Sequence, residues 1–137
     1  MNVHTRKLLE NARHMKFADV LRVLQYDDID INATDQEEKT VLHYAARHGS
    51  NAILIKVLDN INVNINSQDN YGKTPLHYAM IAKCTELLQI LLACEDLAIN
   101  MEDNEGKKPI QYALDTNSAV NLHRLLSHKD INVNTTD

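Results

Sequence analysis

Two histidines occupy equivalent places in the chain and are its first candidates for chemistry. His43 and His77 stand at the same position of two related Thr-x-Leu-His-Tyr-Ala segments, which begin at Thr40 and Thr74. An imidazole binds a metal or acts as a general base when further ligands or an orienting partner stand close to it. The spacing puts one histidine in each structural unit, and the sequence offers no carboxylates that converge on them. We therefore expect neither metal binding nor catalysis at these histidines.

The other reactive side chains form no recognised catalytic or metal-binding pattern. His123 and His128 do not combine with Cys94 into a zinc spacing, and residues 27–30 lack the glycine and the distal glutamate of a calcium loop. The chain has 3 glycines, too few to build a phosphate-binding loop as well as its turns. These groups are most simply solvated loop residues. We predict no catalytic residue, no metal and no cofactor, and hence that the chain is not an enzyme.

The elements that carry these side chains recur at a constant interval along the chain. Residues 40–45, 74–79 and 108–113 are related segments, and leucines recur at positions 24, 58, 92 and 126. A fixed period of about 34 residues, kept without insertions, indicates one helical unit stacked several times around a shared core. We predict a single domain over residues 1–137, with repeats at about residues 1–34, 35–68, 69–102 and 103–137.

Residues 74–79, TPLHYA, follow a Gly-Lys pair and precede an apolar-Asn pair, and this pattern resembles the ankyrin repeat. The resemblance spans about residues 5–134. It implies an all-α fold, an α-solenoid of stacked helix-turn-helix units joined by β-hairpin-like loops. It also implies that His43 and His77 hydrogen-bond between adjacent loops, a role that Gln111 in the third copy can share.

Within one repeat, the first helix has clear start and stop signals. Thr74 can cap the helix and Pro75 suits its first position, whereas Gly49 can end it in the left-handed conformation. The column of Gly49 holds Met15, Lys83 and Asn117 in the other copies, and for Met15 and Lys83 this predicts strained or altered turns. Second helices are expected at residues 52–58, 85–92 and 119–127. Their wide apolar stripe suggests the inner helix layer, and an Asp followed by Gly72 or Gly106 predicts a hairpin between units.

Polar residues at both ends of the array indicate caps. Glu10, Asn11 and Asp19 replace apolar or small residues of the inner copies in the first repeat, and Asn121 and His123 do so in the last. This pattern favours a self-sufficient stack of four. The chain also ends where a further hairpin would begin, so it can equally be the front of a longer protein.

Composition limits the possible partners. The formal charge of -5 and the pI of about 5.7 argue against nucleic acids and anionic membranes, which attract clustered Lys and Arg. Cys84 and Cys94 suit a reducing compartment, and no apolar run approaches the roughly 18 residues of a membrane span. We expect a cytoplasmic or nuclear protein. The Asn- and Ile-rich composition suggests a further possible location, the cytosol of a host cell, if the source is an intracellular pathogen.

The resemblance implies binding of another protein through hairpin tips and the exposed side of the first helices, which line a concave groove. These positions differ between copies while their neighbours stay constant, as expected of surface columns. Arg47, Tyr71 and Ile81 form the predicted centre; the alternative is that Tyr71 packs over its own hairpin and Ile81 is half covered. The predicted groove residues are Arg13, His14, Gln36, Glu37, Lys39, Arg47, His48, Asn70, Tyr71, Lys73, Ile81, Ala82, Asn104, Glu105, Lys107, Asp115 and Thr116.

Asn32, Asn66, Asn100 and Asn134 form another constant column. We expect each side chain to bond local backbone and hold its turn. The resemblance adds that an Asn in this column, eight residues after a Leu, is similar to the acceptor of the cellular asparaginyl hydroxylase. Asn66 and Asn100 are therefore candidates for hydroxylation.

Three functions follow as hypotheses. The first is a non-catalytic, monomeric adaptor that binds another protein through the concave groove. The second is an N-terminal domain that selects substrates for a larger enzyme or effector, with the chemistry outside this chain. The third is a structural stack that forms oligomers.

Overall fold

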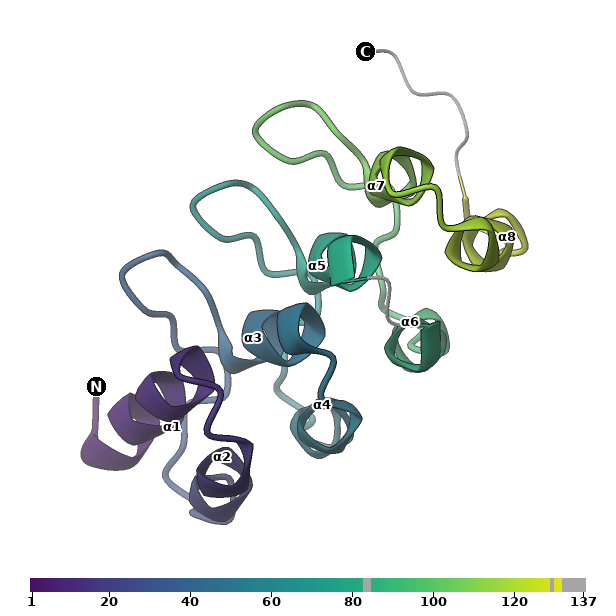
Figure 1. Ribbon diagram of the computed structural model, residues 1–137. Helices are drawn as coiled ribbons and strands as arrows, with labels where there is room; N and C mark the ends of the chain where they lie inside the picture. Colours follow the sequence, from purple (N-terminus) through teal and green to yellow (C-terminus); the bar gives the residue numbers. More distant parts are fainter. Residues whose placement is uncertain (83–84, 129, 132–137) are drawn as a thin grey trace.

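The computed structural model describes residues 1–82, 85–128 and 130–131, and this part of the chain contains helices and loops but no strand. The helices come in four consecutive pairs that stand side by side (Figure 1). The first helices of the pairs form one rank and the second helices form another, with α1 and α2 at one end of the stack and α7 and α8 at the other. The bounds are α1 Val3–Arg13, α2 Phe17–Val23, α3 Val41–His48, α4 Asn51–Leu58, α5 Pro75–Ala82, α6 Thr85–Leu92, α7 Pro109–Asp115 and α8 Ala119–Leu126.

The first helices begin as the sequence predicts. The Thr74 hydroxyl accepts a hydrogen bond from the His77 amide at 3.4 Å, and Thr40 does the same for His43 at 3.3 Å. Each hydroxyl satisfies an amide that has no partner within its helix. Pro75 is the first residue of α5, where a missing amide costs no hydrogen bond.

The turns after α1, α3 and α7 are left-handed. Gly49 has φ 71°, and the same column has φ 59° at Met15 and φ 54° at Asn117. The expected strain at Met15 is therefore present, since the methionine adopts a conformation that its Cβ disfavours. Lys83, in the same column, lies outside the described residues.

The first helices form the inner rank, which corrects the assignment of the second helices to that position. In α5 six consecutive residues are buried, from Pro75 to Met80, whereas α6 buries Leu87, Leu88 and Leu91. Small residues such as Ala46 and Ala79, both fully buried, let neighbouring first helices approach closely. The wide apolar stripe of the second helices therefore did not identify the inner rank. The first helices are more buried because each inner one, such as α5, is covered by helices on both sides and by its hairpin.

The hairpins project from the first helices, all on one side of the stack (Figure 1). Each closes through two backbone bonds; in the third repeat the Asp69 amide donates to the Lys73 carbonyl and the Gly72 amide donates to the Asp69 carbonyl, both at 2.9 Å. Gly72 and Gly106 have φ of 75° and 78°, and Glu38 takes their place with φ 61°. Adjacent hairpins are also bonded, since the Asn104 amide donates to the Tyr71 carbonyl at 2.9 Å. The hairpins thus form a continuous wall.

The cap prediction holds only in part. In the first repeat Glu10 is exposed and Asn11 and Asp19 are half-buried, as suits a polar end. In the last repeat Asn121 is fully buried rather than facing solvent. Its Oδ1 faces the Thr85 hydroxyl at 3.4 Å, while its Nδ2 has no partner among the described residues. Asn121 fails as a cap because its column points into the core of the repeat.

Candidate functional site

The hairpin wall and the inner helices enclose a hollow of about 530 Å³ at the middle of the stack. It brings together the three residues predicted as the centre of the groove, Arg47, Tyr71 and Ile81, from α3, the third-repeat hairpin and α5. Arg47 is exposed, and Tyr71 and Ile81 are 51% and 40% exposed. The other lining residues are Glu37, Lys39, Lys73, Tyr78 and Ala82.

Tyr71 is held in place from both sides. Its hydroxyl donates to Glu37 of the preceding hairpin at 3.3 Å, and the Nζ atoms of Lys39 and Lys73 lie 4.9 and 5.6 Å from its ring centroid. The ring therefore packs across two hairpins, not over its own alone, and still leaves half of its surface open. A fixed, half-open aromatic ring loses little conformational entropy when a partner covers it.

Lys39 is not a surface residue, which corrects its place among the predicted groove positions. Its side chain is 2% exposed and its Nζ lies 3.2 Å from a fully buried Asp69 carboxylate oxygen. The same carboxylate accepts a hydrogen bond from the Tyr78 hydroxyl and from the amides of Tyr71 and Lys73 at 2.9 and 3.0 Å. Despite its burial, these donors hold the pKa of Asp69 below its usual value.

This Lys-Asp-Tyr cluster repeats along the floor of the groove. Lys73 lies 3.5 Å from Asp103, which accepts from the Tyr112 hydroxyl, while Asp35 accepts from Tyr44. Each ion pair joins the lysine of one hairpin to the aspartate of the next, so it links adjacent repeats. The lysines, aspartates and tyrosines of this cluster form three constant columns in the sequence. Which lysine pairs with which aspartate, however, is determined only when the hairpins stack.

His43 and His77 connect each hairpin to the next, as the resemblance implied. The Nδ1 atom of His77 accepts the Thr74 amide hydrogen at 3.1 Å, so Nε2 carries the proton and donates to the Lys107 carbonyl at 3.0 Å. His43 makes the same contacts with Thr40 and with Lys73 of the next repeat. Burial lowers the pKa of both imidazoles below 6.5, so they are neutral and unsuited to acting as acids.

We expect stability to fall as the pH drops from about 7 to about 5. Well above pH 6.5 both histidines are neutral in the folded and unfolded states. Below it, the unfolded chain takes up protons that the folded chain, with its lowered pKa values, resists. In urea unfolding, the His43→Gln/His77→Gln variant should lose less stability over this range than the wild type. His123→Gln, at an exposed site, is the control; equal losses in all three proteins would contradict the assignment.

The asparagine column joins repeats instead of holding local turns, which corrects the expectation. Asn66 donates to the Asp96 carbonyl and accepts from the Ala98 amide, each at 2.8 Å, and Asn100 donates to the Asp130 carbonyl at 2.8 Å. Both side chains reach the following repeat because the loops stack in register. Asn134 lies outside the described residues.

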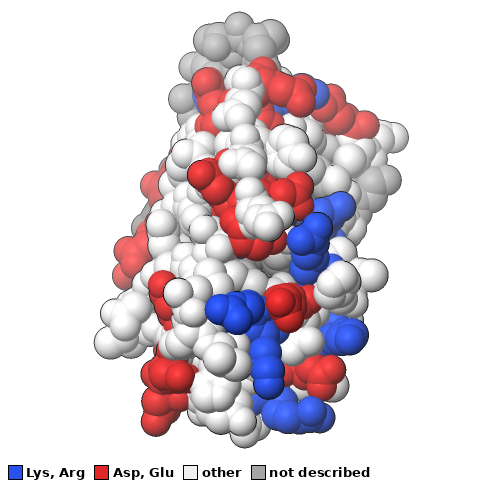
Figure 2. Space-filling model, turned by 90° about the vertical axis from the view of Figure 1, so that its left-hand side faces the viewer, with Lys and Arg blue, Asp and Glu red and all other residues white. Residues whose placement is uncertain are grey.

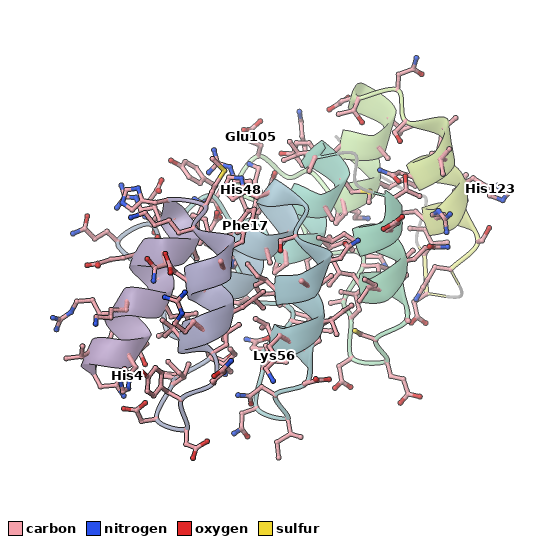
Figure 3. The ribbon with its side chains drawn as sticks, turned by 60° about the horizontal axis from the view of Figure 1, so that its bottom comes forward. His4, Phe17, His48, Lys56, Glu105 and His123 are labelled. Atoms are coloured by element: carbon pink, nitrogen blue, oxygen red, sulfur yellow. The ribbon has the colours of Figure 1, made fainter. Side chains whose placement is uncertain are left out.

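The other predicted groove residues are spread along the stack. Arg13, His14, Asn70, Asn104, Glu105 and Asp115 are exposed, and Lys73 and Glu37 are half-buried. His48 is also half-buried, since its ring stacks on Tyr44 at 6.3 Å and lies 6.2 Å from Phe17, beside which Figure 3 shows it. Asn70 and Asn104 donate to the carbonyls of Gln36 and Asn70 in the preceding hairpins, at 3.4 and 2.8 Å.

Among the described residues, no three His, Cys, Asp or Glu side chains gather as a metal site, and no helix is long and apolar enough to cross a membrane. Cys94 is half-buried and unpaired by a disulfide, and its burial raises its pKa, whereas Cys84 lies outside the described residues.

Stacked helix pairs, a bonded hairpin wall and Thr-His links between repeats define a helical repeat solenoid. The family model "Ankyrin repeats (3 copies)" matches residues 8–103 and 54–137, and the chain belongs to the ankyrin repeat family. No curated protein matches the chain. Ankyrin repeats are generally protein-protein interaction modules, and proteins built from them are typically non-catalytic.

Proposed function

We propose that the protein is a non-catalytic adaptor that binds a partner protein through the groove between the hairpin wall and the inner helices. The observation that carries the proposal is the hollow at Arg47, Tyr71 and Ile81. An aromatic ring, an aliphatic side chain and an arginine meet there on rigid elements, and tyrosine and arginine are among the residue types that supply most of the binding energy at protein interfaces. Backbone bonds fix both walls, so binding costs little ordering.

We expect the triple variant Arg47→Glu/Tyr71→Ala/Ile81→Ala to lose the partner while remaining folded. Arg47 is exposed and the other two side chains are at least 40% exposed, so the removal of all three costs the core little. Affinity capture from cell lysate with the wild type and the triple variant should yield proteins that only the wild type retains. Ile55→Ala is the control, because Ile55 is 51% exposed on α4 in the outer rank. Identical captures from the wild type and the triple variant would mean that binding occurs elsewhere.

Two other functions follow from the same surface. As the targeting domain of a larger enzyme or effector, the chain would use this groove to select the substrate; the length of the native reading frame decides this. As a structural stack it would self-associate, whereas we propose a monomer. Sedimentation velocity over a range of concentrations separates these, because self-association raises the sedimentation coefficient with concentration.

We propose a cytoplasmic or nuclear location, or the host cytosol if the source is an intracellular pathogen.

Hydroxylation of Asn66 and Asn100 stays a proposal. Both side chains are half-buried at the edge of the stack, and the amide of each bridges to the next repeat. A hydroxylase must therefore open these bridges, so modification should increase as the repeats are destabilised. After incubation with the asparaginyl hydroxylase, mass spectrometry should find added oxygen on both residues; its absence from both would refute the proposal.

A further inference from the structure

One column on the helix side of the groove changes its charge along the stack. Arg13, Arg47, Ile81 and Asp115 occupy equivalent positions at or next to the ends of the four inner helices, and all four are exposed. From the first repeat to the last, the column reads two cations, an apolar residue and an anion. The inference drawn from it rests on the groove being the binding surface.

The two arginines at the start of this column have no partner within the described structure. Among the described residues no hydrogen bond or ion pair engages the guanidinium of Arg13 or Arg47, whereas Arg22 on α2 is paired with Asp19 at 3.1 Å. Both arginines lie in the last turn of a helix, where a positive charge favours the helix dipole. The interaction with the helix dipole does not hold either side chain in one position, so both guanidinium groups can bind carboxylates.

The other end of the groove disfavours anions. Asp115 is exposed and is held by Lys107 at 3.4 Å, and Glu105 is exposed on the hairpin wall opposite. Figure 2 shows the hairpin side of the molecule with the first repeats at the bottom; Lys and Arg gather in its lower right part, with Asp and Glu beside and between them, and Asp and Glu also lie across its middle and top. In this column an acidic ligand therefore meets an unpaired arginine in each of the first two repeats and no cation in the last.

We propose that the groove binds an extended segment of a partner protein with two carboxylate side chains followed by an apolar one. The carboxylates contact Arg13 and Arg47, and the apolar side chain enters the hollow between Tyr71 and Ile81. Neighbouring packed helices lie about 8–10 Å apart, and a chain in the extended polyproline II conformation advances about 3.1 Å per residue, with three residues per turn. One repeat thus corresponds to about three residues, and every third side chain of such a chain points to the same side, so the segment reads acidic-x-x-acidic-x-x-apolar.

The test selects peptides from a displayed random library on the intact chain and titrates the enriched peptides by fluorescence. We expect enriched peptides to carry the acidic pair ahead of the apolar residue. Arg13→Gln/Arg47→Gln should bind them about five- to twentyfold more weakly, with a smaller effect of added salt on its affinity. Arg22→Gln, which removes a paired arginine from α2, should bind as the wild type does. Thermal unfolding of each variant checks that it is folded.

Several results would overturn the proposal. They are an absence of enriched peptides, enriched peptides without acidic pairs, or equal affinity for the wild type and the double arginine variant. Tyr71→Ala/Ile81→Ala separates this failure from failure of the groove itself. If this variant loses affinity and the arginine variant does not, the groove is the binding surface but Arg13 and Arg47 do not bind carboxylates of the partner. If neither loses affinity, both are wrong.

Discussion

Asp69→Ala should destabilise the protein by about 3–5 kcal/mol, as expected when one partner of a buried ion pair is removed. The Asp69 carboxylate is fully buried and lies 3.2 Å from the Lys39 ammonium, which is itself 2% exposed. Without it, Glu37 at 3.7 Å is the one carboxylate that still pairs with Lys39 among the described residues, and Tyr78 and two backbone amides lose their acceptor. Since a domain of this size is stable by about 5–15 kcal/mol, the loss is a large share.

Two further aspartates provide the matched series for urea unfolding. Asp103 is also buried, but its partner Lys73 is 15% exposed at 3.5 Å, so Asp103→Ala should cost somewhat less. Asp115→Ala breaks a pair whose side chains are 34% and 57% exposed and should cost less than about 1 kcal/mol. All three variants remove one negative charge, so net charge does not distinguish them. An unfolding midpoint for Asp69→Ala equal to that of Asp115→Ala would contradict the structural role of the buried pair.

Gly72→Ala should destabilise the stack by about 2–5 kcal/mol, and far more than Gly106→Ala. Both glycines are left-handed, at φ 75° and 78°, so either alanine costs about 1–2 kcal/mol of backbone strain. A Cβ on Gly72 would also lie 2.5 Å from Oδ1 and 2.7 Å from the backbone nitrogen of Asn104, which overpacks the hairpin wall. Around Gly106 nothing among the described residues lies within 4 Å of that position.

Urea unfolding of the two glycine variants measures this difference directly. Gly72→Ala should also weaken partner binding, because the shifted Asn104 amide bonds to the Tyr71 carbonyl and so helps to place the ring. Gly106→Ala should keep both binding and most of the stability. Equal midpoints for the two variants would show that the hairpins are not packed against one another as described.

The sequence predicted those features that one repeat determines by itself. Thr74 and Pro75 start a helix and Gly49 ends one, because caps and left-handed turns depend on a few neighbouring residues. The constant repeat period then predicted the stack, and the ankyrin resemblance predicted the role of His43 and His77.

Features that depend on contacts between repeats were missed or misassigned. Lys39 looks like a surface cation, yet it is buried because the next hairpin brings Asp69 over it. The amide of Asn66 reaches the following loop, and Asn121 is buried with its Oδ1 facing the Thr85 hydroxyl of the preceding repeat. Each outcome depends on which columns face each other after stacking, and that requires the orientation of the hairpins relative to the inner helices.

Site-specific photo-crosslinking tests the central claim, that the groove is the binding surface. A photoreactive phenylalanine is introduced at Tyr71, inside the hollow, or at Ile55, on the outer rank; both native residues are 51% exposed. The protein retained by the wild type and lost by the triple variant should crosslink from position 71 and not from position 55. Crosslinking of that protein from position 55 alone, or equally from both, would contradict the account.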